Sequence, residues 1–333
     1  PSYNLLFLLN IKYFIIIHKL CKLKFQLYIF FISNFVFLLH GCYIYIMEDL
    51  IIKKLKKIIK ETNKNKSSYW EEYLKEDLDF LNESEFLGFA GNYTKKSLKN
   101  IAHSLLIRII NGNQIFKTET YSKYKSIYDK IDRFVDSDTI RHIFTFEKIK
   151  RYLNPKKICI IGDGKLNAVL GAHLTFPLSK IYSINLSEIL INDYFILQKT
   201  HTNLKNSVEL KDDLNFIETS KKLSLVPSNF KNKLLDKKID LFINIASFQE
   251  MTINEIDNYF EIIKNNNSKL YCCNREYKKL SGGEELYFEK YPWANALKIF
   301  WEDCPWHQKN YSLRPPFIHN YAGNVKHCLV DFS

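Results

Sequence analysis

The spacing of apolar residues divides the chain into two parts. Between Met47 and about Lys150, apolar side chains recur three or four positions apart, as at Leu98, Ile101 and Leu105. Residues at that spacing lie on one face of a helix, so the pattern predicts helices with one buried side. We therefore predict a mostly helical region over residues 47–150.

After Asn154 and Pro155 the pattern changes, because short apolar runs alternate with stretches of helical spacing. Such alternation is typical of strands and helices wound around a parallel sheet. The predicted strands cover residues 158–161, 181–184, 214–217, 239–245 and 269–273. The predicted helices cover residues 166–174, 188–200, the neighbourhood of Leu223 and 253–264.

The C-terminal part departs from this alternation. Residues 297–301 and 326–332 have the composition of strands, and the loop between them is rich in proline and aromatic residues. This predicts an antiparallel closing pair. A five-stranded parallel sheet with such a pair is similar to the layout of class I methyltransferases. The predicted fold is thus a Rossmann-like α/β domain over residues 151–333, preceded by the helical region.

Residues 1–46 differ from the rest of the chain, since they contain four lysines, no acidic residue and an uncharged run over 25–46. That run is long enough to span a bilayer. The chain begins with Pro1 rather than methionine, however, and an amphipathic helix follows Met47. Two interpretations stay open, a translated spacer upstream of a start at Met47 or a genuine membrane segment. We expect function to reside downstream in both, and membrane association only in the second.

The net charge of +12 comes from 48 basic and 36 acidic residues. The lysines are scattered along predicted helices among glutamates, as on solvated helix faces, so we expect no nucleic-acid partner. Seven cysteines, with Cys272 and Cys273 adjacent, do not make a disulfide framework. The cysteine content favours a reducing compartment, and we predict a cytoplasmic protein.

A glycine turn, Gly162-Asp163-Gly164, lies between the first predicted strand and the helix after it. Glycines allow a tight turn and close approach of a ligand, and a doubly wound sheet binds nucleotide-like ligands at this point. A tight turn without a ligand is the alternative. Asn185, at the end of the next strand, is placed to bond ribose hydroxyls or to cap the following helix.

The sequence of this turn does not distinguish between the two cofactors that such turns bind, a dinucleotide and S-adenosylmethionine. A dinucleotide fingerprint needs glycine where Asn167 stands and an acid where Asn185 stands. The S-adenosylmethionine pattern needs an acid where Ile160 stands and a third glycine where Leu166 stands. Both patterns are incomplete in this chain.

Polar residues follow the fourth and fifth predicted strands. Asn244 ends the fourth, Ser247, Gln249 and Glu250 come next, and Arg275 follows the fifth. Because the carboxyl ends of parallel strands meet at one edge of a sheet, these side chains are expected to face the crevice where such sheets bind ligands.

Three motifs, INIASFQEM, CCNREYKKL and EKYPWANALKIFWEDCPW, occur in order along the chain. In them the sequence resembles a family of sugar O-methyltransferases, over roughly Tyr69 to Phe332. The resemblance implies methyl transfer from S-adenosylmethionine to a sugar hydroxyl, in a surface polysaccharide or its lipid- or nucleotide-linked precursor. It implies a cofactor site formed by Gly162, Asp163, Gly164, Asn185, Asn244 and Ser247.

Such a transfer needs a base to remove the hydroxyl proton. Glu250 and His307 are the candidates, although Glu250 also suits the start of a helix and His307 also suits an ordinary surface position. For the sugar, aromatic faces and hydrogen-bonding side chains are expected from Gln249, Arg275, Tyr291, Trp293 and Trp306.

We expect no metal, because Cys272, Cys273, Cys304 and Cys328 lack CxxC spacing and the chain contains no HExxH motif. The transfer is therefore predicted to be metal-independent.

Three other functions are weighed against this one. A nicotinamide-dependent reductase or epimerase of sugar nucleotides would need a YxxxK pair, which Tyr271 and Tyr277 do not provide. A catalytically degenerate module that binds a partner, such as a glycosyltransferase, is suggested by the incomplete glycine turn. Nucleic-acid methylation is suggested by charge alone, and the Asn-Pro-Pro-Tyr type of element is absent after the fourth predicted strand.

Overall fold

The computed structural model describes residues 50–59, 67–75, 98–200, 202–212, 216–217, 219–312 and 314–333. The chain divides into two units, Pro1–Lys53 and Lys54–Ser333, and the fold below is that of the second. The hydrophobic run predicted at 25–46 lies outside the described residues. Among the residues that are described, no helix has both the length and the apolar character needed to cross a membrane.

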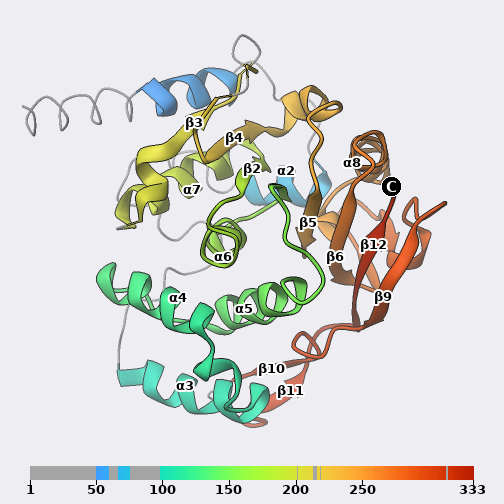
Figure 1. The fold of residues 1–333 in the computed structure, drawn as a ribbon. Helices are drawn as coiled ribbons and strands as arrows, with labels where there is room; N and C mark the ends of the chain where they lie inside the picture. Colours follow the sequence, from blue (N-terminus) through green and yellow to red (C-terminus); the bar gives the residue numbers. More distant parts are fainter. Residues whose placement is uncertain are drawn as a thin grey trace, which may run out of the picture. The chain divides into compact units, whose positions relative to one another are not determined.

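An eight-stranded sheet forms the centre of the described unit, with strand order β3-β4-β2-β1-β5-β6-β12-β9 (Figure 1). Neighbouring strands are parallel except at β12, which is antiparallel to both β6 and β9. The strands are β1 (Lys157–Ile161), β2 (Lys180–Asn185), β3 (Val208–Leu210), β4 (Leu223–Pro227), β5 (Leu241–Ile245), β6 (Lys269–Arg275), β9 (Leu297–Asp303) and β12 (Val325–Asp331). The predicted α/β class, with a mostly parallel sheet and an antiparallel closing pair, is confirmed.

The remaining elements surround this sheet or connect its strands. The α-helices are α2 (Ser68–Lys75), α3 (Leu98–Asn111), α4 (Glu119–Lys130), α5 (Ser137–Ile149), α6 (Asn167–Thr175), α7 (Ser187–Lys199) and α8 (Ile253–Asn265). Short 3-10 helices are η2 (Ile115–Lys117), η3 (Asn203–Ser207), η4 (Ser228–Leu234), η5 (Phe248–Glu250) and η6 (Phe288–Lys290). Two small antiparallel pairs join β7 (Tyr277–Lys279) to β8 (Glu285–Tyr287) and β10 (Lys309–Tyr311) to β11 (Ile318–Asn320).

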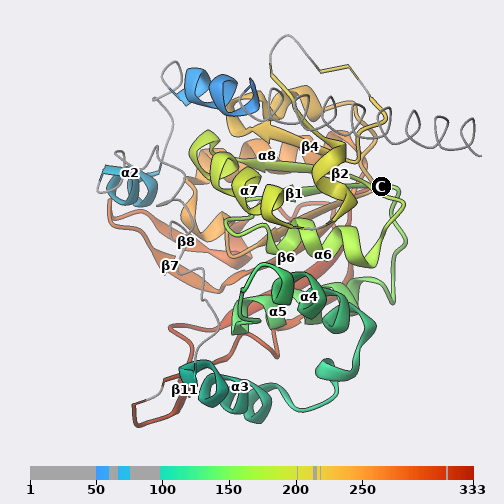
Figure 2. The same ribbon diagram turned by 90° about the vertical axis from the view of Figure 1, so that its left-hand side faces the viewer.

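The central strands are buried along nearly their whole length because both faces of the sheet are covered. Alternate strand residues such as Phe242 and Leu270 pack with α8 residues in one buried cluster. On the opposite face, the Tyr271 hydroxyl lies 3.3 Å from Thr145 of α5. Figure 2 shows α5 and α6 together on that side. Continuous apolar runs are what a sheet buried on both faces requires.

Helices α5 and α6 pack very closely at one glycine. A Cβ at Gly171 of α6 would lie 2.2 Å from the ring of Phe146 in α5, so a larger residue would push the helices apart. Helix α5 begins where the side chain of Asp136 accepts a hydrogen bond from the Thr139 N–H at 2.8 Å. This cap satisfies a backbone donor that the first turn leaves unpaired. The close contact at Gly171 thus packs α5, which belongs to the helical region, against α6, which is the first crossover helix of the sheet.

One prediction for this part is wrong. The neighbourhood of Leu223 was expected to be helical, whereas Leu223–Pro227 forms the buried strand β4, paired in parallel with β2. A short apolar run has no resolvable period, so sequence alone does not separate a buried strand from a piece of helix. Of the strand expected at 214–217, residues 214–215 lie outside the described residues and 216–217 are in no regular element. The strand before β4 is instead β3.

Candidate active site at the carboxyl edge of the sheet

A cavity of about 520 Å³ opens at the carboxyl ends of β1, β2, β5 and β6. That volume lies within the range of small-molecule sites. Its lining includes Gly162, Asp163, Gly164, Asn185, Ser247, Gln249, Glu250, Arg275 and His307, together with Ser67, Tyr69 and Trp70 of the helical region. The structure thus brings together nine of the predicted site residues, from four strand ends and a distant loop.

The glycine turn after β1 is shaped by contact with the turn after β5. Gly162 has a φ of +75°, and a Cβ at this position would lie 1.8 Å from the Ser247 hydroxyl oxygen. Its N–H donates to the carbonyl of Ile184 at 2.9 Å. Ala246, beside Ser247, also has a positive φ of 59°, which is uncommon for a residue with a side chain. Both turns therefore hold conformations that bring their main chains close together.

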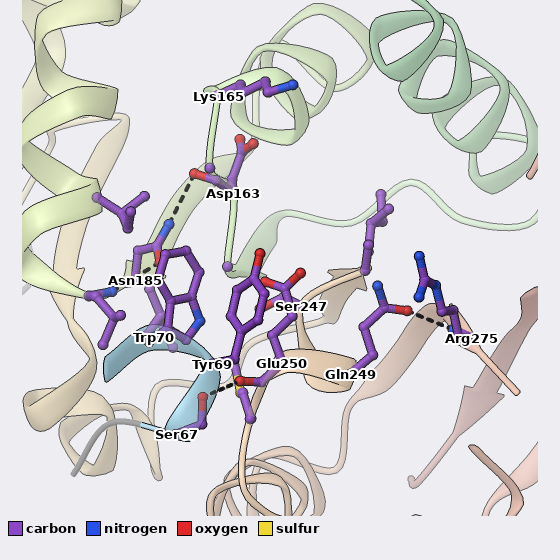
Figure 3. A pocket seen from close by; sticks show the side chains of 18 of the residues that line it. Ser67, Tyr69, Trp70, Asp163, Lys165, Asn185, Ser247, Gln249, Glu250 and Arg275 are labelled. Carbon is purple, nitrogen blue, oxygen red and sulfur yellow. Dashed lines mark hydrogen bonds between the residues drawn. The ribbon is translucent and has the colours of Figure 1, made fainter. Parts of the chain in front are cut away.

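The two polar residues nearest the glycine turn are largely engaged within the protein. The Asp163 carboxylate accepts from the Val169 N–H at 2.8 Å, at the start of α6. The Asn185 side chain donates to the Asp163 carbonyl at 3.0 Å and accepts from the Leu186 N–H at 3.0 Å (Figure 3). Asn185 thus ties the turn after β1 to the start of α7, while still lining the cavity.

Helix α7 supports the turn with a side chain that no sequence motif marks. Asp193 is fully buried and its carboxyl group accepts from the Leu166 N–H at 3.1 Å. Burial raises the pKa of Asp193 well above its usual value, and the nearby Asp163 adds to the rise. The pKa of Asp163 is also raised by burial. Burial thus favours the protonated form of both carboxyl groups, and Asp193 supports the turn through its contact with Leu166.

Asn244 is placed beneath the cavity rather than in its lining. It is fully buried, and its amide donates to the Ile161 carbonyl at 3.2 Å. Its carbonyl oxygen accepts from the Phe248 N–H at 3.1 Å and from the Asn274 amide at 2.8 Å. Asn244 therefore joins the ends of β1, β5 and β6, and its contacts are structural.

Gln249 and Arg275 are linked across the ends of β5 and β6. The Gln249 side-chain oxygen accepts from the Arg275 N–H at 2.8 Å (Figure 3). The Arg275 guanidinium lies over the ring of Tyr321, 5.0 Å from its centroid. Its Nε is buried and has no hydrogen-bond partner within the described part of the chain. A buried unpaired donor in a cavity wall is a candidate contact for an anionic or hydroxyl group of a ligand.

Glu250 is a carboxylate of the cavity whose acidity is altered by burial. Its surroundings raise its pKa from 4.5 to about 7, because burial outweighs the attraction of Lys278 and Arg275. The Lys278 ammonium lies 3.8 Å from the carboxylate, and 22% of the Glu250 side chain is exposed. The N-cap of α8 is Thr252, whose side chain accepts from the Glu255 N–H, and Glu250 lies two residues before this cap.

An aromatic pair from the helical region completes the cavity near Glu250. The Ser67 hydroxyl donates to the Glu250 carbonyl at 2.6 Å, which fixes the start of α2 to the turn after β5 (Figure 3). Tyr69 and Trp70 then line the cavity, and the Lys278 ammonium lies 4.7 Å from the Tyr69 ring centroid. No sequence motif marks this pair, which lies about 180 residues from Glu250 along the chain.

His307 lines the same cavity but is not an ordinary surface histidine. Only 7% of it is exposed, and burial lowers its pKa. Its Nδ1 lies 3.2 Å from the Cys304 sulfur and 3.6 Å from the Cys273 sulfur. Of the two candidate bases, Glu250 has the environment of a group that exchanges protons near neutral pH.

The aromatic residues expected to contact a sugar lie outside the cavity lining. Tyr291 is 7% exposed and packs on Phe248 at a ring distance of 5.9 Å. Trp293 donates from its indole N–H to the Phe288 carbonyl at 2.7 Å. Trp306 stacks on Phe144 of α5 at 5.3 Å. These side chains are held in packing contacts. The aromatic residues that line the cavity are instead Tyr69 and Trp70 of α2, together with Tyr259 and Tyr321.

Comparison with known proteins gives structural similarity alone. No protein-family model and no curated protein matches the chain. A geranyl diphosphate methyltransferase in complex with GPP and sinefungin is 9% identical, with a TM-score of 0.41 over 70% of this chain and 100% of that one. The mitomycin 7-O-methyltransferase MmcR is 10% identical, with a TM-score of 0.37 over 70% and 66%. The methyltransferase domain of bacterial CtHen1 is 12% identical, with a TM-score of 0.34 over 56% and 96%.

Proposed function

We propose that the chain is an S-adenosylmethionine-dependent O-methyltransferase that acts on a hydroxyl group of a sugar or glycan precursor. The observation that carries the proposal is the cavity at the carboxyl edge of the sheet, where the glycine turn after β1 and the Glu250 carboxyl group line one space. The antiparallel β12 between β6 and β9 supports it, since this is the sheet expected of the class.

The residues around the glycine turn fit an adenosyl cofactor. Gly162 has no room for a side chain, and the Asp163 carboxylate accepts a hydrogen bond from the start of α6. The main chain of the turn is therefore the part that we expect to contact the cofactor. Leu186 and Ile189 add apolar surface beside Asn185 in the same lining. We assign Gly162, Gly164 and Asn185 to the cofactor, with apolar contact for a planar ring from the start of α7.

S-adenosylmethionine, when bound, supplies an electrophilic methyl group on a sulfonium sulfur that keeps the bonding pair when the methyl leaves. What remains for the protein is to orient the acceptor and to take its proton. Glu250 suits the second task, because a carboxyl group with a pKa of about 7 is half ionised near neutral pH and accepts a proton without a large energetic cost. Lys278 holds the carboxylate in place from 3.8 Å.

The acceptor side of the cavity favours a polyhydroxylated or anionic substrate. Tyr69 and Trp70 offer ring faces of the kind that pack against the C–H surface of sugars. The unpaired Nε of Arg275 offers a charged donor for a hydroxyl, carboxylate or phosphate. The helical region thus contributes directly to the proposed substrate site through α2.

We also propose a reducing, cytoplasmic location for this activity. The five cysteines within the described residues, namely Cys159, Cys272, Cys273, Cys304 and Cys328, are all free and buried. Unpaired thiols are typical of compartments that keep cysteine reduced.

Calorimetric titration of the full chain with S-adenosylmethionine, S-adenosylhomocysteine and NAD tests the cofactor assignment. Saturable binding of the two adenosyl ligands, without NAD, is expected. Binding of NAD alone would favour a reductase. Binding of none of them by a folded protein would refute the assignment and favour a degenerate partner-binding module.

The acceptor is tested by transfer of a labelled methyl group to a panel of sugar nucleotides and lipid-linked sugars. Glu250→Gln should keep cofactor affinity and lose at least about 100-fold in turnover, the usual contribution of a positioned base. Glu261→Gln, which changes an exposed carboxylate of α8, is the matched control and should retain full turnover. Equal turnover of the two variants would remove Glu250 from the base role.

A further inference from the structure

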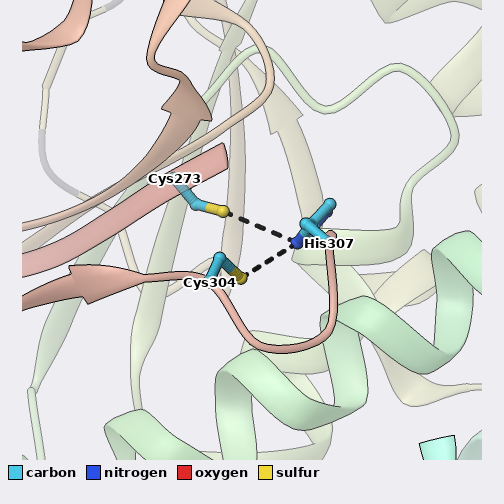
Figure 4. A group of neighbouring side chains, drawn as sticks. All are labelled: Cys273, Cys304 and His307. Atoms are coloured by element: carbon cyan, nitrogen blue, oxygen red, sulfur yellow. Dashed lines mark hydrogen bonds between the residues drawn. The ribbon is translucent and has the colours of Figure 1, made fainter. Parts of the chain in front are cut away.

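Three potential metal ligands meet at the wall of the cavity. Cys273 lies in β6, Cys304 follows directly after β9, and His307 lies three residues further on. The two sulfurs and a ring nitrogen all lie within 4.8 Å of one another (Figure 4). Within the described residues, the group comprises these three side chains.

The spacing of these atoms fits a tetrahedral ion. With Zn–S bonds of about 2.3 Å and Zn–N bonds of about 2.0–2.1 Å, two ligands of a tetrahedron lie roughly 3.6 Å apart. The observed distances from the His307 Nδ1 to the Cys304 and Cys273 sulfurs are 3.2 Å and 3.6 Å. An ion between them would therefore require only small side-chain movements.

Burial and charge also suit a divalent cation. Cys273 and Cys304 are 1% and 0% exposed, and His307 is 7% exposed. Two thiolates alone would be costly in such a dry place, whereas two thiolates and one divalent ion are neutral together. Sulfur and imidazole ligands select Zn²⁺ over harder ions such as Mg²⁺ or Ca²⁺.

The ligands are held by backbone contacts that do not depend on an ion. The Cys304 N–H donates to the Val325 carbonyl at 2.8 Å, and the His307 N–H donates to the Cys304 carbonyl at 3.2 Å. The Gln308 side chain donates to the same Cys304 carbonyl at 2.9 Å and to the Val325 carbonyl at 2.7 Å. The turn is thus preorganised, with Cys304 and His307 facing Cys273.

The nearby His327 does not complete the ligand set. Its Nδ1 lies 3.1 Å from the Tyr271 hydroxyl and its Nε2 lies 3.0 Å from the Glu302 carboxylate, so both nitrogens are engaged. His307 lines the cavity, which leaves a fourth position for water or a ligand atom. Three protein ligands and an exchangeable fourth are typical of open zinc sites.

We propose that Cys273, Cys304 and His307 bind one Zn²⁺ ion through two thiolates and the imidazole Nδ1, with an exchangeable fourth ligand. The ion joins β6 to the turn after β9 and fixes the wall of the cavity. Each thiol releases one proton when it binds, and no oxidation or reduction takes place. The proposal departs from the expectation of no metal, which considered CxxC and HExxH spacing and overlooked the Cys-x-x-His sequence at 304–307.

Cobalt substitution of the untagged full chain tests the site without requiring any variant. After dialysis against a chelator under reducing conditions, Co²⁺ should bind at one ion per chain, with sulfur-to-cobalt charge-transfer bands and the visible bands of tetrahedral cobalt. Zn²⁺ should then displace it, and should raise the Tm by about 5 °C when free Zn²⁺ is ~100 times its Kd. The absence of thiolate bands would overturn the proposal.

Variants then assign the ligands. Cys273→Ala and Cys304→Ala should each weaken cobalt binding by more than about 100-fold, since loss of even an outer-shell partner costs roughly 10- to 100-fold. Cys328→Ala is the matched control, because it removes a buried thiol that packs with α8 residues outside the group. Unchanged cobalt spectra in both cysteine variants, or equal loss in the control, would place the ion elsewhere and overturn the assignment.

Discussion

The raised pKa of Glu250 predicts that this carboxylate destabilises the fold above neutral pH, and that Glu250→Gln relieves the effect. The folded protein holds the group at a pKa of about 7, against an ordinary value of 4.5. The folded state therefore binds the proton more tightly than the unfolded chain does. The contribution of Glu250 to the free energy of unfolding is therefore fully present below about pH 4.5, and it is lost as the pH rises from there through about 7.

The size of the effect follows from the pKa difference. Each pKa unit corresponds to about 1.36 kcal/mol, so a difference of about 2.5 units corresponds to about 3 kcal/mol. Because 22% of the side chain is exposed, solvent screening removes only a small part of this. The unfolding free energy of Glu250→Gln, relative to the wild type, should rise by about 3 kcal/mol between about pH 4 and pH 8.

Urea unfolding of both proteins across that pH range, followed by circular dichroism, measures the difference. The change with pH is the informative quantity, since a constant offset reports only altered contacts with Lys278. The exposed Glu261→Gln should give a stability curve parallel to that of the wild type. If Glu250→Gln also gave a parallel curve, burial would not control this carboxylate, and its proposed role as a base near neutral pH would lose its physical basis.

Further outcomes follow from the same site. Gly162→Ala should abolish binding of S-adenosylmethionine in calorimetry, because its Cβ would lie 1.8 Å from the Ser247 hydroxyl, whereas Gly283→Ala, which has a similar positive φ and open space, should retain it. In the methyl-transfer assay, kcat/KM should rise through about pH 7 as Glu250 ionises, and a flat profile would contradict this. Lys278→Met should move that rise to higher pH, because Lys278 lowers the pKa of Glu250; a shift to lower pH would contradict the pairing.

The parallel core of the fold could be predicted because its strands are buried on both faces. The strands β1, β2, β5 and β6 are short apolar runs, and each was placed at nearly its observed position. The strand β4 was mistaken for a helix, since Leu223–Pro227 is too short to show a period. Its identity depends on pairing with β2, which is a tertiary property.

Most of the predicted residues that line the cavity follow strand ends, and His307 is the exception, since it comes from the turn after β9. Ser247, Gln249, Glu250 and Arg275 reach the cavity because parallel strands end at one edge. Tyr69 comes from a helix distant in sequence, placed by a hydrogen bond to a backbone carbonyl that no motif encodes. Tyr291, Trp293 and Trp306 have side chains of the kind that bind sugars, but in the structure they pack against other residues and do not line the cavity.

The cluster of Cys273, Cys304 and His307 shows why spacing rules fail for ligands shared between strands. In the sheet, β12 lies between β6 and β9 and runs opposite to both. Its first residue, Val325, therefore lies at the edge where β6 and β9 end, and the turn that carries Cys304 crosses over it to reach Cys273. Metal motifs in sequence describe ligands on one local element. Two ligands brought together by an antiparallel insertion have no fixed spacing, so the topology of the closing strands had to be known before the cluster could be seen.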